Sequence, residues 1–196
     1  IIKPITKWQK RVLNAKKIPT TVKEAFKKIR SGRPRPVEIE IPPEALSEFA
    51  NAHNYKKNKI SQPEINNRAI KKAAKILALS KNPVIWAGGG VHLSDASKEL
   101  LALAEYMQIP ILTTPEGKGS ISDKHYLSIG TPQGRSTGNS KDSLRDFFYT
   151  CDVIVAIGTR FANAEPKKSQ RVIQIDIDPK EIGRNHKNTL GIVGDA

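Results

Sequence analysis

The sequence predicts an α/β fold: a doubly wound parallel sheet, Rossmann-like and in three αβα layers, preceded by a fragment of another α/β domain. Two observations carry this prediction. Apolar runs without polar alternation, typical of strands buried on both faces, begin at Val84, Ile111, Val153 and Val172. Segments with helical spacing separate these runs, and strands that alternate with helices favour a parallel sheet with right-handed crossovers.

The stretch 83–91 is the best-defined strand and turn of the chain. It begins at Pro83, which suits the first residue of a strand, and continues through four apolar residues. It ends in three consecutive glycines that permit a tight turn and leave room beside the main chain: Gly88, Gly89 and Gly90. A helix is then expected to start at Ser94-Asp95 and to bury Ala96, Leu100, Leu103, Ala104 and Met107.

The other elements are predicted from local patterns. Residues 1–18 show no period and are expected to be irregular, a helix should run from Pro19 to Gly32, and residues 37–41 alternate as a half-exposed strand. Asp178 is expected to cap a helix, with Pro179 and Glu181 in its first turn. The remaining expected elements are strands at 109–114, 152–158, 171–178 and 191–195 and a helix that buries Leu144, Phe147 and Phe148.

The chain is expected to divide into three parts. Residues 1–43 contain too little apolar material for a domain and are predicted to be the C-terminal remnant of one. Residues 44–62 are polar and are predicted to be a linker, and residues 63–196 to be a second domain. The capping-box spacing of Ser61 and Glu64 predicts the start of its first helix.

The composition excludes several classes. The formal net charge is +14, but residues 1–60 hold 15 Lys and Arg against 5 Asp and Glu, which is +10, while residues 61–196 hold 18 against 14, which is +4. These charges have few aromatic side chains among them, so a solvated surface is favoured over nucleic-acid binding. No apolar run approaches a membrane span, and the single cysteine, Cys151, suits a reducing compartment and a buried, inert thiol. We therefore expect a cytoplasmic protein.

The strand ends suggest a binding site, because the carboxyl ends of parallel strands line one crevice. Arg160 could face a phosphate group there, and Asp176 could accept hydrogen bonds from ribose hydroxyls. The glycines have an alternative role as an ordinary turn. Two nucleotide motifs fail: the dinucleotide fingerprint meets Leu93 at its third glycine, and the P-loop signature meets Gly119 after Gly117-Lys118.

The chain resembles the thiamine-diphosphate-dependent enzymes of the acetolactate synthase and pyruvate oxidase type. The resemblance covers nearly the whole chain, in the order of the end of the family's pyrimidine-binding domain followed by its central domain. The matching segments are Ser31-Gly-Arg-Pro-Arg-Pro-Val37, Pro83-Val-Ile-Trp-Ala-Gly-Gly-Gly90, Ile109-Pro-Ile-Leu-Thr-Thr114, Gly117-Lys-Gly119, Ala156-Ile-Gly-Thr-Arg-Phe161, Ile175-Asp-Ile-Asp-Pro-Lys-Glu-Ile182 and Gly194-Asp-Ala196.

The resemblance implies part of an enzyme that acts on 2-oxo acids as a homodimer or homotetramer. In the family, thiamine diphosphate binds between the pyrimidine-binding domain of one subunit and the pyrophosphate-binding domain of another. The activating glutamate would precede Ile1 and the Mg²⁺-binding segment would follow Ala196, so this chain alone is expected neither to hold the cofactor nor to catalyse. Its partners would be the remaining domains of the same enzyme, and the cofactor would supply the carbon–carbon chemistry.

The resemblance also implies a nucleotide site, since the central domain of acetolactate synthases carries FAD and other family members bind ADP or nothing there. By motif match the contacts would be Arg33, Gly88, Gly89, Gly90, Thr113, Gly130, Arg160, Asp176 and Asp195. Flavin-binding members continue after Arg160-Phe161 with acidic residues and an arginine, where this chain has Ala162, Asn163 and Ala164. The loop at Gly130 offers Gln133 and Arg135 in place of Met and His. These departures put FAD in doubt, and FAD, ADP or an empty scaffold all remain open.

Two other functions fit parts of the sequence. A free-standing Rossmann-type nucleotide-binding enzyme would explain the glycine turns, and would be favoured if the gene began at Ile1 and stopped after Ala196. A basic nucleic-acid-binding module would use residues 1–60, and its binding would weaken steeply with salt.

Overall fold

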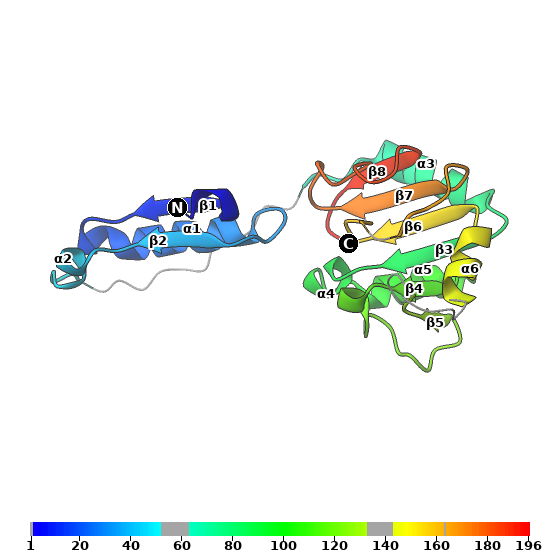
Figure 1. Ribbon diagram of the computed structural model, residues 1–196, viewed down its shortest axis with the longest axis horizontal. Helices are drawn as coiled ribbons and strands as arrows, with labels where there is room; N and C mark the ends of the chain where they lie inside the picture. Colours follow the sequence, from blue (N-terminus) through cyan, green and yellow to red (C-terminus); the bar gives the residue numbers. More distant parts are fainter. Residues whose placement is uncertain (1, 52–62, 133–142, 163) are drawn as a thin grey trace. The chain divides into compact units, whose positions relative to one another are not determined.

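The chain forms two compact units, Ile1–Gln62 and Pro63–Ala196, and each is described here by itself (Figure 1). The structure is a computed structural model that describes residues 2–51, 63–132, 143–162 and 164–196. No helix in the described part of the chain combines the length and hydrophobicity that crossing a membrane requires.

The first unit contains a parallel β-α-β arrangement: β1 (Trp8–Arg11), α1 (Ile18–Arg30) and β2 (Val37–Glu40). The prediction that residues 1–18 are irregular was therefore wrong. β1 carries mostly exposed polar side chains and so shows no apolar period, but its backbone pairs with β2 from Trp8 opposite Val37 to Arg11 opposite Glu40. Two short 3₁₀ helices, η1 (Lys3–Ile5) and η2 (Ala15–Lys17), flank it.

The first unit also includes the beginning of the predicted linker. The short helix α2 (Pro43–Leu46) buries Ala45, and the Glu48 carboxylate accepts a hydrogen bond of 2.8 Å from the Ala15 backbone N–H. On α1 the buried residues are Thr21 and Ala25. Residues 52–62 of the predicted linker lie outside the described residues.

The second unit is built on a six-stranded parallel sheet in the order β5-β4-β3-β6-β7-β8. Counted from β3 as the first, this order is 3-2-1-4-5-6, that of dinucleotide-binding Rossmann sheets, so the predicted fold is confirmed. β5 was not predicted, because it has only three residues and its pairing with β4 shifts register. Such a strand leaves no pattern in the sequence. The strands are β3 (Pro83–Ala87), β4 (Ile111–Thr113), β5 (Ser128–Gly130), β6 (Val153–Ile157), β7 (Arg171–Asp176) and β8 (Thr189–Val193).

The helices of the second unit are shorter than the sequence suggests. They are α3 (Asn67–Ala78), α4 (Gly90–Leu93), α5 (Ser97–Met107) and α6 (Ser143–Thr150), with the 3₁₀ helix η3 (Pro115–Gly117). α3 starts six residues after Ser61, since the side chain of Asn66 accepts hydrogen bonds from the N–H groups of Arg68 and Ala69. The prediction of a helix start at the capping box was therefore wrong.

Two further predicted caps have other roles. The Ser94 hydroxyl donates to the Gly90 carbonyl at 2.8 Å and so closes α4, while α5 begins only at Ser97. No helix follows Asp178, whose carboxylate accepts from the Lys180 N–H at 3.1 Å within a turn. A short side chain that bonds two residues ahead stabilises a turn as readily as a helix start, so the pattern was ambiguous.

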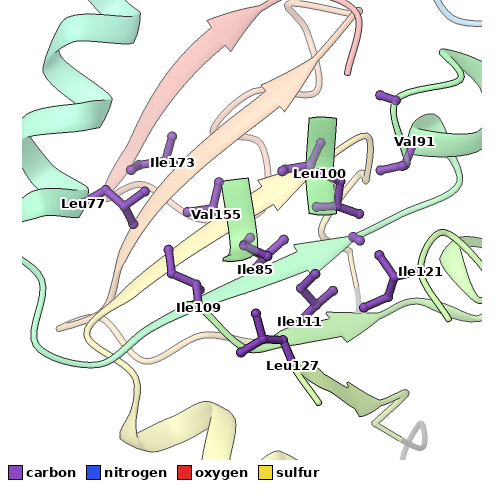
Figure 2. Packing of buried hydrophobic residues seen from close by; sticks show 14 of the residues in the cluster. Leu77, Ile85, Val91, Leu100, Ile109, Ile111, Ile121, Leu127, Val155 and Ile173 are labelled. Atoms are coloured by element: carbon purple, nitrogen blue, oxygen red, sulfur yellow. The ribbon is translucent and has the colours of Figure 1, made fainter. Parts of the chain in front are cut away.

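The sheet separates two apolar layers, because alternate residues of a strand point to opposite faces. On one face Ile85 packs with Leu77 of α3 and Leu100 of α5, as Figure 2 shows. On the other face Trp86 meets Phe148 of α6 edge-on, with ring centroids 4.9 Å apart. Neither layer covers the ends of the strands, where the connecting loops lie.

Candidate functional site

The carboxyl ends of the strands meet at one edge of the sheet, which we call the carboxyl edge. Main-chain hydrogen bonds just past the strands join the loops: Gly88 N–H donates to Ile157 O at 2.9 Å, and Gly158 N–H donates to Ile175 O at 3.0 Å. Gly194 N–H donates to Asp176 O at 3.1 Å in the same way. In this strand order the crevice for a ligand is expected between β3 and β6, where the direction of winding reverses.

At this switch point the glycine turn packs directly on the loop after β6. A Cβ on Gly88 would lie 2.5 Å from the Gly158 oxygen and 2.6 Å from the Thr159 Cβ, and a Cβ on Gly90 would collide with the Gly158 Cα. Gly158 itself has a φ of +59°, which favours glycine. The space beside Gly88 and Gly90 is therefore filled by the chain's own backbone, and a ligand would have to lie above the interlocked loops.

Gly89 and Thr113 lie beside this contact. A Cβ on Gly89 would be 3.1 Å from the Glu116 Cβ, in the loop after β4. The buried hydroxyl of Thr113, at the end of β4, is 2.7 Å from the Thr131 hydroxyl. Gly130 ends β5 with a φ of +105°, a left-handed conformation that favours glycine.

The acidic candidates lie on the other side of the switch point. Asp176 ends β7, is 4% exposed, and accepts a hydrogen bond of 2.9 Å from the Asp178 N–H. Asp195 follows Gly194 and is exposed. Arg160 is also exposed, and its carbonyl accepts from the Asn185 side chain at 2.8 Å. A carboxylate and an exposed guanidinium at the same edge of the sheet have the chemistry to contact ribose hydroxyls and phosphate, respectively.

The predicted site residues thus fall into two groups. Gly88, Gly89, Gly90, Thr113, Gly130, Arg160, Asp176 and Asp195 all lie at the carboxyl edge. Arg33 lies in the first unit, where its carbonyl accepts from the Lys7 ammonium at 3.0 Å, and its part in a shared site stays a prediction. Gln133, Arg135 and Asn163, which carry part of the argument on flavin, lie outside the described residues.

The carboxyl edge is long. Five strand intervals of about 4.8 Å separate the end of β5 from the end of β8, so Gly130 and Asp195 are on the order of 24 Å apart. A compact ligand would reach only neighbouring strands. Only an extended molecule, such as a dinucleotide laid along the edge, could touch all the predicted positions at once.

One residue that shapes the site was missed by sequence reasoning. Gln174 is 2% exposed in the middle of β7 and donates to the carbonyls of Thr159, at 3.3 Å, and Glu181, at 3.2 Å. Its oxygen accepts from the Gly183 N–H at 3.0 Å. Gln174 therefore ties the loop after β6 to the turn after β7. A single amide within an otherwise apolar strand was the available signal, because buried polar groups need partners.

The site offers no metal centre or nucleophile in the described part of the chain. No group of three or more His, Cys, Asp or Glu side chains there could hold a metal ion. Cys151 is 3% exposed. Burial and the nearby charge of Asp152 raise the pKa of its thiol to about 11, although a hydrogen bond with Thr150 acts to lower it. The prediction of a buried thiol is confirmed. Its lack of reactivity stays a prediction.

The sequence is similar to a family of known enzymes. Residues 70–196 match the family model described as thiamine pyrophosphate enzyme, central domain. The chain is 38% identical to a Methanocaldococcus jannaschii protein named "Probable acetolactate synthase large subunit", over 98% of this chain and 34% of that protein. It is 34% identical to "Acetolactate synthase" of Mycobacterium bovis, over 100% of this chain and 33% of that protein. The chain thus spans about a third of the length of these relatives.

The fold is similar to a solved structure of low sequence identity. Benzoylformate decarboxylase from Polynucleobacter necessarius superposes with a TM-score of 0.80 at 20% identity, covering 98% of this chain and 37% of that one. Likeness at this identity supports the fold alone. It agrees with the strand order found in the second unit.

Proposed function

The chain belongs to the thiamine pyrophosphate enzymes, as their central domain, and from this membership we propose that it serves a thiamine-diphosphate-dependent enzyme of acetolactate synthase type that acts on 2-oxo acids. The observation that carries the proposal is the match of residues 70–196 to the central domain, together with more than a third of identical residues shared with an acetolactate synthase large subunit. The domain would contribute assembly and a nucleotide site. Carbon–carbon chemistry would come from thiamine diphosphate and Mg²⁺ held by other domains.

The activity is tested on the full-length protein that carries this chain. With pyruvate, thiamine diphosphate and Mg²⁺ it is expected to form acetolactate, and with the cofactor omitted it is expected to form none. Failure to consume pyruvate or any other 2-oxo acid under these conditions would contradict the proposal. We also propose a cytoplasmic homodimer or homotetramer, which light scattering of the full-length protein would distinguish from a monomer.

The carboxyl edge is proposed to bind an adenine nucleotide, ADP rather than FAD. Support comes from two residues on the β7 side of the switch point. Buried Asp176, at the end of β7, suits ribose hydroxyls, and exposed Arg160, in the loop after β6, suits phosphate. Against FAD stand Ala162 and Ala164 where flavin-binding members have polar residues. Ala164 is 3% exposed and packs in the apolar layer with Trp86, so it turns away from a ligand.

Titration calorimetry with ADP tests this site. Arg160→Ala is expected to weaken ADP binding about tenfold, because a hydrogen bond to a charged group contributes about 1.5 kcal/mol or more. The matched control is Arg68→Ala, at an exposed position of α3, which should leave binding unchanged. A yellow protein with flavin absorption would overturn the preference for ADP. Absence of heat with ADP and of any bound flavin would leave the domain a scaffold alone.

A further inference from the structure

A pocket of about 380 Å³ opens at the amino edge of the second unit's sheet, on the side opposite the carboxyl edge. It lies between the last two turns of α3 and the starts of β6 and β7. Its volume is at the lower end of the range for small-molecule sites. None of the residues proposed for the nucleotide lines it.

Three cationic side chains surround this pocket: Lys72, Lys75 and Arg171. Lys72 and Lys75 are three residues apart on α3 and so lie on the same helical face, and Arg171 is the first residue of β7. All three are exposed, and none forms an ion pair with a residue in the part of the chain that the structure describes. Three cations that converge without a carboxylate partner create a positive potential over the opening.

The one acidic residue in the lining is already engaged. The two carboxylate oxygens of Asp152 accept hydrogen bonds from the N–H groups of Lys81, at 2.7 Å, and Asn82, at 3.0 Å. The carbonyls of the last turn of α3 are also engaged, since Lys75 O accepts from Leu79 N–H and Leu77 O from Ser80 N–H. With three cations against one carboxylate, the lining has a net charge of +2 and selects anions.

Three apolar side chains belong to the lining and are called here the apolar floor, beside the polar side chains of Ser80, Ser169 and Asn188. Ile76 is half-buried, Val153 is 5% exposed, and Leu79 is 84% exposed at the rim. A leucine that exposed has no packing role in the described structure. The cations together with this floor fit a ligand with an anionic head and an apolar body, and a simple inorganic ion would leave the floor unused.

We propose that this pocket binds an organic phosphate monoester, with the phosphate against Lys72, Lys75 and Arg171 and the organic group against Leu79 and Ile76. A phosphate monoester carries close to two negative charges and three acceptor oxygens at neutral pH, which match three cationic donors. The site is independent of the proposed nucleotide site, because the two lie at opposite edges of the sheet.

The probe is phenyl phosphate, titrated into the full chain by calorimetry at low ionic strength. Saturable binding is expected, tighter than that of inorganic phosphate because of the apolar floor. Arg171→Ala and Lys75→Ala are each expected to weaken it about fivefold, the upper end for an exposed charge pair. Lys98→Ala, an equal loss of charge at an exposed position of α5, is the control and should have no effect. All three side chains are exposed, so the variants should fold.

Leu79→Ser and Arg160→Ala complete the test. Leu79→Ser should weaken phenyl phosphate binding and leave inorganic phosphate unchanged. Arg160→Ala, at the opposite edge of the sheet, should leave phenyl phosphate binding unchanged, so failure here and failure of the nucleotide proposal would be told apart. The inference is overturned if phenyl phosphate shows no saturation in the millimolar range, or if Lys98→Ala weakens binding as much as Arg171→Ala does.

Discussion

Gly88 and Gly158 pack main chain against main chain at the switch point of the sheet, although 70 positions separate them. A Cβ on Gly88 would stand 2.5 Å from the Gly158 carbonyl oxygen, and Gly88 N–H donates across the same junction to Ile157 O at 2.9 Å. The two loops that frame the candidate nucleotide site therefore hold one another in place. Their glycines are needed for this contact whether or not a ligand binds above them.

Gly88→Ala is expected to destabilise the second unit by about 1–3 kcal/mol, the usual cost of forcing extra volume into a packed site. The added methyl would meet backbone of Gly158 and the Thr159 Cβ, neither of which can swing aside. Urea unfolding measures the change. The control is Gly194→Ala, where a Cβ would meet nothing within 4 Å and the effect should be close to zero. Equal stability of the two variants would contradict the interlock.

Asp152→Asn is expected to lower the free energy of unfolding by about 1 kcal/mol at pH 7. Burial raises the pKa of the Asp152 carboxyl, but backbone N–H donors, including those of Lys81 and Asn82, outweigh it, so the pKa lies below its ordinary value. The charged form thus stabilises the fold above the unfolded-state pKa, and this stability is lost as pH falls through the lower folded-state pKa.

The difference between wild type and Asp152→Asn should accordingly shrink as the pH is lowered below about 4. Unfolding in urea at a series of pH values measures it. Glu64→Gln, at an exposed position outside the helices and strands, is the matched control and should change stability by less than about 0.5 kcal/mol. A difference that stayed constant down to pH 3 would argue against the hydrogen-bonded carboxylate.

Gln174→Leu is expected to destabilise the second unit by at least about 3 kcal/mol. The change keeps the side chain's approximate size but leaves the carbonyls of Thr159 and Glu181 and the N–H of Gly183 without their partner. Each orphaned buried group costs on the order of 1–3 kcal/mol. Thermal or urea unfolding checks the value. Gln9→Leu, on exposed β1, should change stability by less than about 0.5 kcal/mol.

Cys151 is expected to resist alkylation in the native protein. With a pKa of about 11, only about one thiol in a thousand is ionised at pH 8, and the side chain is 3% exposed. Iodoacetamide followed by mass spectrometry should find the native thiol unmodified and the urea-unfolded thiol modified. Rapid modification under native conditions would show that the site opens.

Several elements could be predicted because their signal is local. The unbroken apolar runs of β3 and β6 and the buried face of α5 follow from the residue pattern alone, since burial on both faces or on one helical stripe leaves a period in the sequence. Helix starts were predicted less well. Asn66 and Ser94 show why: a short polar side chain can begin a helix, close one or hold a turn, and only the surrounding backbone decides which.

Part of the candidate site could also be predicted from the sequence. The strand-end positions could be grouped at one edge, because parallel strands necessarily end together. The contact of Gly88 with Gly158 and the pocket lined by Lys75 and Arg171 could not be foreseen. Each joins residues that are distant in the chain and carry no mutual spacing.

The sequence by itself determined which segments are buried, that the sheet is parallel, and which side chains stand at the strand ends, because hydrophobic periodicity is a property of consecutive residues. Tertiary structure alone decided that the polar β1 and the three-residue β5 become strands, since the hydrogen bonds that make them so come from neighbouring strands. It also decided that the glycines meet backbone and that exposed cations of α3 and β7 share one opening, because proximity between distant segments arises only when the chain packs.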